Sequence, residues 1–98
     1  MESNIPKYDL PVDYIVGEGF AKDLLKSYKN FPCKIESGLF ILCIKGTMEV
    51  TINTNTHHIS ENDLITLPPN CILEVHTFSS DIQIYYAGFS SHFIESIN

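Results

Sequence analysis

The chain has 98 residues, of which 44% are hydrophobic, which is enough apolar material for one core. We therefore expect a single domain over residues 1–98. The formal net charge is −6 and all six basic residues are lysines, which excludes a basic face for nucleic acid and bidentate recognition of phosphate by arginine. No stretch approaches the roughly 20 consecutive apolar residues of a membrane-spanning helix, and the first residues lack the pattern of a secretory signal.

Three cysteines, Cys33, Cys43 and Cys71, are odd in number and widely spaced. They form no Cys-x-x-Cys pair and no Cys/His cluster with the spacing of a zinc site. We expect reduced thiols that pack among apolar neighbours as small hydrophobic groups. Free thiols of this kind are typical of a cytoplasmic protein.

Residues 1–30 are expected to form an N-terminal extension. Pro6 and Pro11 favour extended backbone, and residues 12–16 have the composition of a short strand. Apolar residues then recur at helical spacing, which predicts a short helical turn. The residues with this spacing are Phe20, Leu24, Leu25 and Tyr28.

Residues 31–89 carry the pattern of successive strands. An almost continuous apolar run covers 39–44, Gly46 supplies a turn, and apolar residues alternate with polar ones over 48–53. Further strands are expected at 57–59, 64–67, 71–77 and 82–87. Closely spaced strands with turns between them predict a mainly β fold, a small antiparallel β-barrel of the jelly-roll type. Residues 90–98 are expected to begin a helix with a serine N-cap.

Two segments of this barrel resemble the sequence motifs of the cupin fold. Gly46 stands where a glycine ends the first cupin motif. In the second motif, Asn62-Asp63 stands for Gly-Asp, Pro68 takes the proline, and Asn70 stands for a glycine. Asparagine tolerates left-handed backbone, so the turns keep their chemistry.

The same resemblance places the metal-ligand positions of a cupin enzyme on residues that cannot form a metal site. These positions are Cys33, Ile35, Leu39 and Leu73. A single thiol does not make a site, because a metal ion needs three or four converging ligands. We therefore expect no metal, no cofactor and no catalytic residue, and we expect these four positions to supply apolar packing.

Within the cupins, residues 31–46, 49–53, 62–69 and 90–94 resemble the N-terminal domain of AraC-family transcription regulators, of the type found in Bacteroides. The resemblance implies a barrel that senses a small-molecule effector, and a homodimer. It also implies a longer parent protein whose C-terminal helix-turn-helix motifs bind DNA and are absent from this chain. We expect no direct contact of this segment with nucleic acid or with a membrane.

The apolar barrel interior is the place where an effector is expected to bind, because ligand pockets are mostly apolar with a few placed polar groups. The expected lining residues are Leu39, Ile41, Met48, Leu73 and Tyr86. The alternative, which the sequence favours for so small a barrel, is that these side chains simply fill the interior.

Two other functions remain open on the sequence. One is a stand-alone cupin enzyme, a metal-dependent isomerase or oxygenase, with His57, His58 and His76 as ligands. Adjacent residues of a strand face opposite sides, so we expect the His57–His58 pair at a strand edge with one ring partly buried, and His76 and His92 at the surface. The other is a purely structural dimer module that associates through an exposed strand edge or apolar patch.

Overall fold

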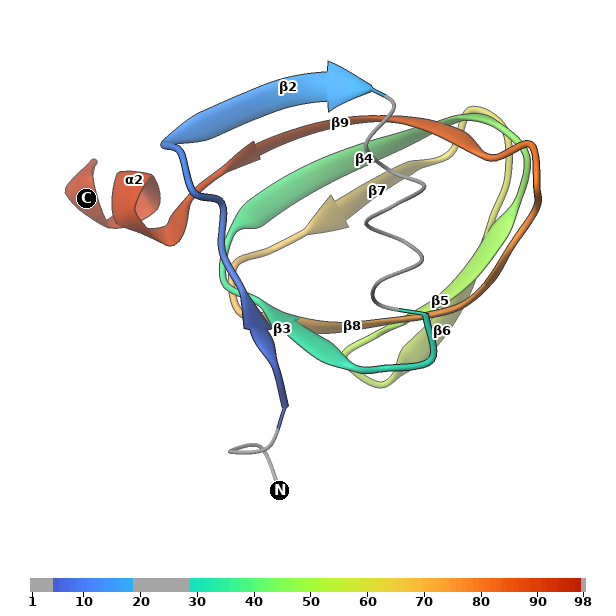
Figure 1. Cartoon of the computed structure of the whole chain (residues 1–98), viewed down its shortest axis with the longest axis horizontal. Coiled ribbons are helices and arrows are strands. Elements are labelled where there is room, and N and C mark those ends of the chain that lie inside the picture. The colour runs from blue at the N-terminus through green and yellow to red at the C-terminus, as the bar shows by residue number, and fades with distance from the viewer. Residues whose placement is uncertain (1–4, 19–28, 98) are drawn as a thin grey trace.

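The computed structural model of the chain describes residues 5–18 and 29–97, and within them two sheets face each other (Figure 1). The five-stranded sheet has the order β1-β3-β8-β5-β6. Its strands are β1 (Lys7–Tyr8), β3 (Cys33–Ile35), β8 (Cys71–Phe78), β5 (Met48–Ile52) and β6 (Asn55–Ile59). The four-stranded sheet has the order β2-β9-β4-β7. Its strands are β2 (Tyr14–Glu18), β9 (Gln83–Phe89), β4 (Gly38–Lys45) and β7 (Leu64–Leu67).

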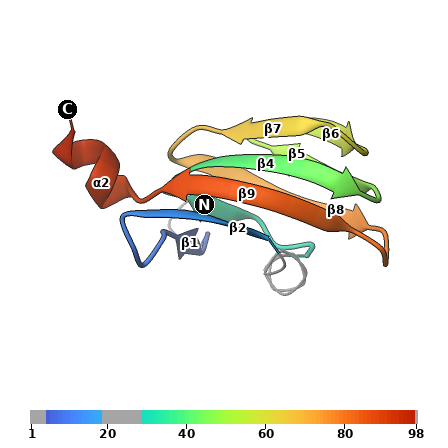
Figure 2. The same ribbon diagram turned by 90° about the horizontal axis from the view of Figure 1, so that it is seen from above.

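The predicted mainly β fold is confirmed. β1 pairs in parallel with β3, and the other pairs between these strands are antiparallel. A short hairpin joins β5 to β6, and other short connections, such as those after β4 and β7, carry the chain from one sheet to the other. The helix α2 (Ser91–Ser96) follows β9 and extends away from the end of the sheets, as Figure 2 shows.

Each sheet contains one strand from the N-terminal part of the chain. β1 lies against β3, and β2 lies along β9 at the edge of the four-stranded sheet. The strand expected at residues 12–16 is thus present, shifted by two residues. The helical turn expected around Phe20, Leu24, Leu25 and Tyr28 lies outside the described residues.

Turns in this fold depend on asparagine. Asn30, Asn53, Asn62 and Asn70 have positive φ angles of 62°, 59°, 73° and 68°. An asparagine enters this left-handed region more readily than most residues. The prediction that asparagine keeps the turn geometry at these positions is therefore confirmed for Asn62 and Asn70.

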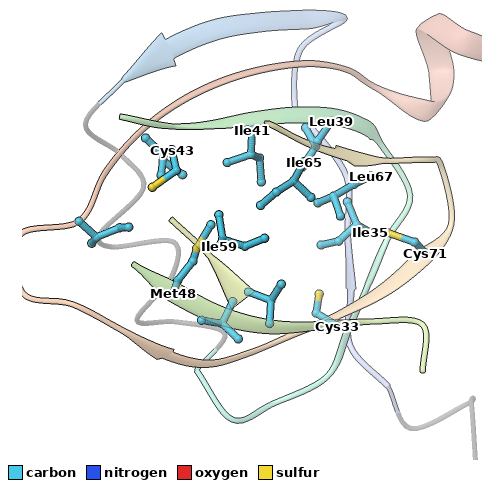
Figure 3. Packing of buried hydrophobic residues seen from close by; sticks show 14 of the residues in the cluster. Cys33, Ile35, Leu39, Ile41, Cys43, Met48, Ile59, Ile65, Leu67 and Cys71 are labelled. Atoms are coloured by element: carbon cyan, nitrogen blue, oxygen red, sulfur yellow. The ribbon is translucent and has the colours of Figure 1, made fainter. Parts of the chain in front are cut away.

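The core lies between the two sheets, where alternate residues of the strands point inward (Figure 3). Leu67 is the largest of the fully buried side chains, with 1% of its surface exposed. Gly88 allows Leu39 to approach the backbone of β9, because a Cβ at position 88 would lie 2.9 Å from the carbonyl oxygen of Gly38 and collide with Leu39. The interior is therefore closely packed, and its shape depends on small as well as large residues.

The C-terminal helix begins as the sequence predicts. Ser90 is the N-cap of α2, and its Oγ accepts a hydrogen bond of 3.0 Å from the backbone N–H of Phe93. This bond satisfies one of the free N–H groups of the first helical turn. Among the residues that the structure describes, no helix has the length and hydrophobicity needed to cross a membrane.

Candidate functional site

The five residues expected to line a pocket belong to one apolar cluster. Leu39 and Ile41 from β4 and Met48 from β5 are buried and lie in the space between the sheets (Figure 3). Leu73 and Tyr86 are partly buried and pack against the same cluster. The structure therefore brings these residues together, and whether a ligand enters among them stays a prediction.

The four positions that correspond to cupin metal ligands supply apolar packing, as predicted. Cys33, Ile35 and Leu39 are buried in the core, and Leu73 packs against it. Cys33 and Leu73 lie directly opposite each other on β3 and β8. Among the described residues, no group of three or more His, Cys, Asp or Glu side chains is placed to hold a metal ion.

Tyr86 brings a hydroxyl group to the apolar interior. It lies on β9 opposite Gly17 of β2 and Ile41 of β4. Since Gly17 has no side chain, the phenol of Tyr86 extends over it, and a Cβ at position 17 would lie 3.4 Å from the Tyr86 Oη. The side chain thus offers an apolar ring and a hydrogen-bonding end in the same place.

A second tyrosine, Tyr8 of β1, also packs against the apolar cluster, and the sequence analysis did not predict it. Burial raises the pKa of the Tyr8 phenol, and the electrostatic influence of Tyr86, Asp9 and Cys33 raises it further. The phenol is therefore neutral at physiological pH and keeps its proton for donation. Because β1 has only two residues, no alternation of apolar and polar residues marks it as a strand.

The three cysteines are free and buried, so the prediction of packed thiols is confirmed. Burial raises the pKa of Cys43, despite a lowering contribution from its hydrogen bond to Lys45, and burial likewise raises the pKa of Cys71. The Cys43 thiol lies 3.5 Å from the carbonyl oxygen of Gly46, to which it donates. Protonated thiols are poor nucleophiles and poor metal ligands.

Asp9 forms a polar connection between three distant segments at the end of the barrel. Its carboxylate accepts hydrogen bonds from the Ser37 hydroxyl at 2.7 Å, from the Leu10 N–H at 2.9 Å, and from both the hydroxyl and the N–H of Ser91. Burial alone would raise the pKa of Asp9, but the bonds from Ser91, Ser37 and Leu10 outweigh it and lower the pKa. No local sequence pattern indicates this connection, since the partners of Asp9 lie 28 and 82 residues away.

The histidines are exposed or partly exposed, and the expectation of one partly buried ring in the His57–His58 pair was wrong. His57 and His58 are both exposed, because β6 is the edge strand of its sheet. His76 is partly buried on β8, where its Nε2 lies 2.6 Å from the Thr51 hydroxyl and its Nδ1 lies 3.5 Å from a carboxylate oxygen of Glu74. His92 is exposed, as expected.

Comparison with solved structures supports the fold. The cupin domain of Cnp3 from Schizosaccharomyces pombe is similar with a TM-score of 0.59 and 13% identity, over 92% of this chain and 67% of that chain. Ethanolamine utilization protein Q from Salmonella typhimurium is similar with a TM-score of 0.57 and 15% identity, over 85% and 67%. A conserved Streptococcus pyogenes protein of unknown function is similar with a TM-score of 0.57 and 12% identity, over 83% and 68%. At these identities the likeness shows the cupin fold alone.

Family assignment rests on the sequence itself. No curated protein matches the chain. The family described as "AraC-like ligand binding domain" matches residues 34–97, which is more than half of the chain. This protein therefore belongs to the family of AraC-like ligand binding domains.

Proposed function

We propose that this chain is the effector-sensing and dimerising part of an AraC-family transcription regulator, of the type found in Bacteroides, and that it takes up no metal. The DNA-binding helices would belong to a longer parent protein. The observation that carries the proposal is the match to the AraC-like ligand binding family over residues 34–97. Because this is a family of ligand-binding domains, we look for the effector site in the barrel.

The barrel interior has the chemistry that such a site requires. Leu39, Ile41 and Met48 supply apolar surface. Tyr86 and Tyr8, which both pack against the apolar cluster, add hydroxyl groups. Small-molecule sites combine a mainly apolar lining with a few polar groups that orient the ligand. We infer that the effector is a small, largely apolar molecule with at least one hydrogen-bonding group.

The alternative of a stand-alone metal-dependent cupin enzyme finds little support among the described residues. It requires His57, His58 and His76 to converge, whereas the first two are exposed on β6 and the third bonds to Thr51 on the outer face of β8. The positions that correspond to cupin metal ligands are apolar apart from Cys33. We therefore infer a binding function for this barrel.

Adjacent tyrosines on opposite faces of β9 provide a test of this proposal. Compounds from a panel of short-chain acids and small aromatic acids would be titrated into the chain by calorimetry. For a compound that binds, Tyr86→Phe should weaken the affinity roughly three- to tenfold, because one hydrogen bond contributes about 0.5–1.5 kcal/mol. Tyr85→Phe is the matched control and should leave the affinity unchanged, since Tyr85 lies on the outer face and is 45% exposed.

The proposal fails if the two variants weaken binding equally, because the ligand would then not lie in the barrel interior. It also fails if no compound of these classes binds at millimolar concentration. Thermal unfolding of both variants would show that the fold is retained.

A further inference from the structure

The outer face of the four-stranded sheet is apolar and exposed. Six large side chains on it are between 39% and 79% exposed. They are Tyr14, Val16, Phe40, Leu64, Tyr85 and Phe89, and we call them the apolar face. Figure 2 looks onto this sheet, and no described element crosses it.

The strand register makes the apolar face continuous. Tyr14 of β2 is paired with Phe89 of β9. Val16 and Phe40 lie on either side of Ala87, their common partner on β9. Tyr85 and Leu64 likewise lie on either side of Leu42 on β4. Side chains directly opposite each other on neighbouring strands are close enough to touch, so the rows merge into one surface.

Helix α2 extends the apolar face at one end of the sheet. The Phe93 ring stacks on the Phe89 ring with centroids 5.4 Å apart, and it meets the Tyr14 ring edge-on at 6.3 Å. Ile97, just after the helix, is 67% exposed. The apolar surface therefore continues from four strands onto the C-terminal helix.

The outer face of the other sheet shows what a solvated face of this protein looks like. There Glu74, His76 and Thr51 are linked to one another, and His58 lies opposite Glu49. Antiparallel sheets that face water on one side carry polar residues there. The apolar face departs from this pattern within the same molecule, which indicates that it is covered in the functional state.

The size of the apolar face fits a protein contact. Taking about 200 Å² for a complete aromatic side chain and somewhat less for an aliphatic one, the six exposed residues present on the order of 600 Å². This reaches the upper end of the largest patch on a typical monomer, about 300–600 Å². With Phe93 and Ile97 added, it approaches the roughly 800 Å² that each partner buries in a stable interface.

Charge favours a second copy of the chain as the occupant. The chain has a net charge of −6, yet none of the six residues of the apolar face is charged. Their shared partners Ala87 and Leu42 are apolar, and the one charged partner in the strand register is Glu18, at the end of the edge strand β2, which is paired with Tyr85. A charged partner would find no opposite charge among the six residues, whereas two identical apolar faces complement each other. Sheets pack face to face in this way about 10 Å apart.

We propose that the apolar face binds the same face of a second copy, so that the two four-stranded sheets pack together in a homodimer. The inference deepens the dimerising role in the proposed function and rests on it. It assigns that role to the strands of the barrel and the adjoining end of α2.

Sedimentation velocity over a range of concentrations up to about 200 µM tests the inference directly. The chain should sediment as a dimer of twice 11.1 kDa. Phe40→Lys places two charges in the dimer interface and should raise the dissociation constant at least about 100-fold. Val16→Lys should also weaken the dimer, and its side chain, 79% exposed in the monomer, leaves the fold unaffected.

His58→Lys is the matched control, because it places the same side chain on an exposed position of the other sheet. It should change the dissociation constant less than about twofold, since exposed surface substitutions usually have small effects. Thermal unfolding of all three variants would show that each is folded.

A wild-type chain that stays monomeric at the highest concentration overturns the inference, as do lysine variants that dimerise as tightly as wild type. If the apolar face is instead covered by another segment of a longer parent protein, and that protein is monomeric, the inference is wrong. Effector binding is measured separately: a dimer that binds no effector contradicts only the sensing role, and a monomer that binds one contradicts only the sheet contact.

Discussion

Left-handed backbone positions in this chain differ in what surrounds them. Asn30, Asn53, Asn62 and Asn70 are all exposed, so their side chains have space. Gly46, with φ of 86°, is enclosed by the turn before β9, and a Cβ there would lie 2.9 Å from both the Ile82 Cα and a carboxylate oxygen of Asp81, and closer still to the Ser79 hydroxyl. The enclosed turn therefore requires glycine, whereas an exposed one accepts asparagine.

Substitution of Gly46 tests this difference. Gly46→Ala should lower the free energy of unfolding by about 2 kcal/mol or more, because left-handed strain of about 1–2 kcal/mol adds to the steric conflict with Ile82. Asn70→Gly is the control and should change stability by less than about 1 kcal/mol, since glycine adopts the same φ without strain. Urea unfolding measures both, and an equal loss in the two variants would contradict the explanation.

The candidate site could be predicted from the sequence only where a residue sits in a regular strand. Leu39, Ile41 and Met48 alternate with outward-facing neighbours, so their inward direction follows from the period of a strand. Tyr8 lies in a strand of only two residues, so no alternation predicts its direction. The influence of Tyr86 and Cys33 on it depends on the pairing of β1 with β3. That parallel pairing joins residues far apart in sequence, which no local pattern reveals.

At the scale of elements, the strands from β4 to β9 follow their sequence pattern closely, whereas the N-terminal strands do not. The expected strand at residues 64–67 is β7 itself, and that at 71–77 is β8 without its last residue. β1 and β2 are held by partners elsewhere in the chain, with β2 against β9 and β1 against β3. Local composition therefore indicated an extended segment without telling which sheet it joins.

Asp9 is the residue that ties these N-terminal elements to the rest of the fold. Its carboxylate holds Ser37, before β4, and Ser91, at the first residue of α2. Hydrogen bonds to a charged acceptor contribute about 1.5–3 kcal/mol each where they are shielded from water, and less where they are partly exposed. Removing the charge should therefore loosen the contacts of both β1 and α2.

Asp9→Asn should lower the free energy of unfolding by about 1–3 kcal/mol at pH 7. The pKa of Asp9 is lowered in the folded state from an ordinary value of 3.8. Its stabilisation is thus fully present above that value and is lost as the pH falls through the lowered folded-state pKa. The difference in stability between wild type and variant should shrink below about pH 4.

Urea unfolding at several pH values measures this dependence. Asp13→Asn is a suitable control, because the Asp13 side chain is exposed and its backbone carbonyl oxygen accepts the contact from the Ser90 N–H. A constant difference between wild type and Asp9→Asn from pH 7 to pH 3 would contradict the role given to the Asp9 charge.

At the scale of the whole molecule, the barrel has three regions of different chemistry, which are its interior and the outer faces of its two sheets. The interior is apolar with Tyr8 and Tyr86 at its margin. The outer face of the five-stranded sheet is polar, with Glu74 and His76 on β8. The outer face of the four-stranded sheet is apolar and exposed. In the proposed function, effector binding belongs to the interior and self-association to the apolar face.

The measurement that tests the central claim most directly is a methyl NMR titration of the chain with a compound that binds in calorimetry. Methyl groups of Leu39, Ile41 and Met48 should shift or exchange on binding, because they lie in the interior. The methyls of Val16 and Leu64, which lie on the apolar face, should stay unchanged at constant dimer fraction. Shifts confined to Val16 and Leu64, with the interior methyls unaffected, would contradict the assignment of the barrel interior as the effector site.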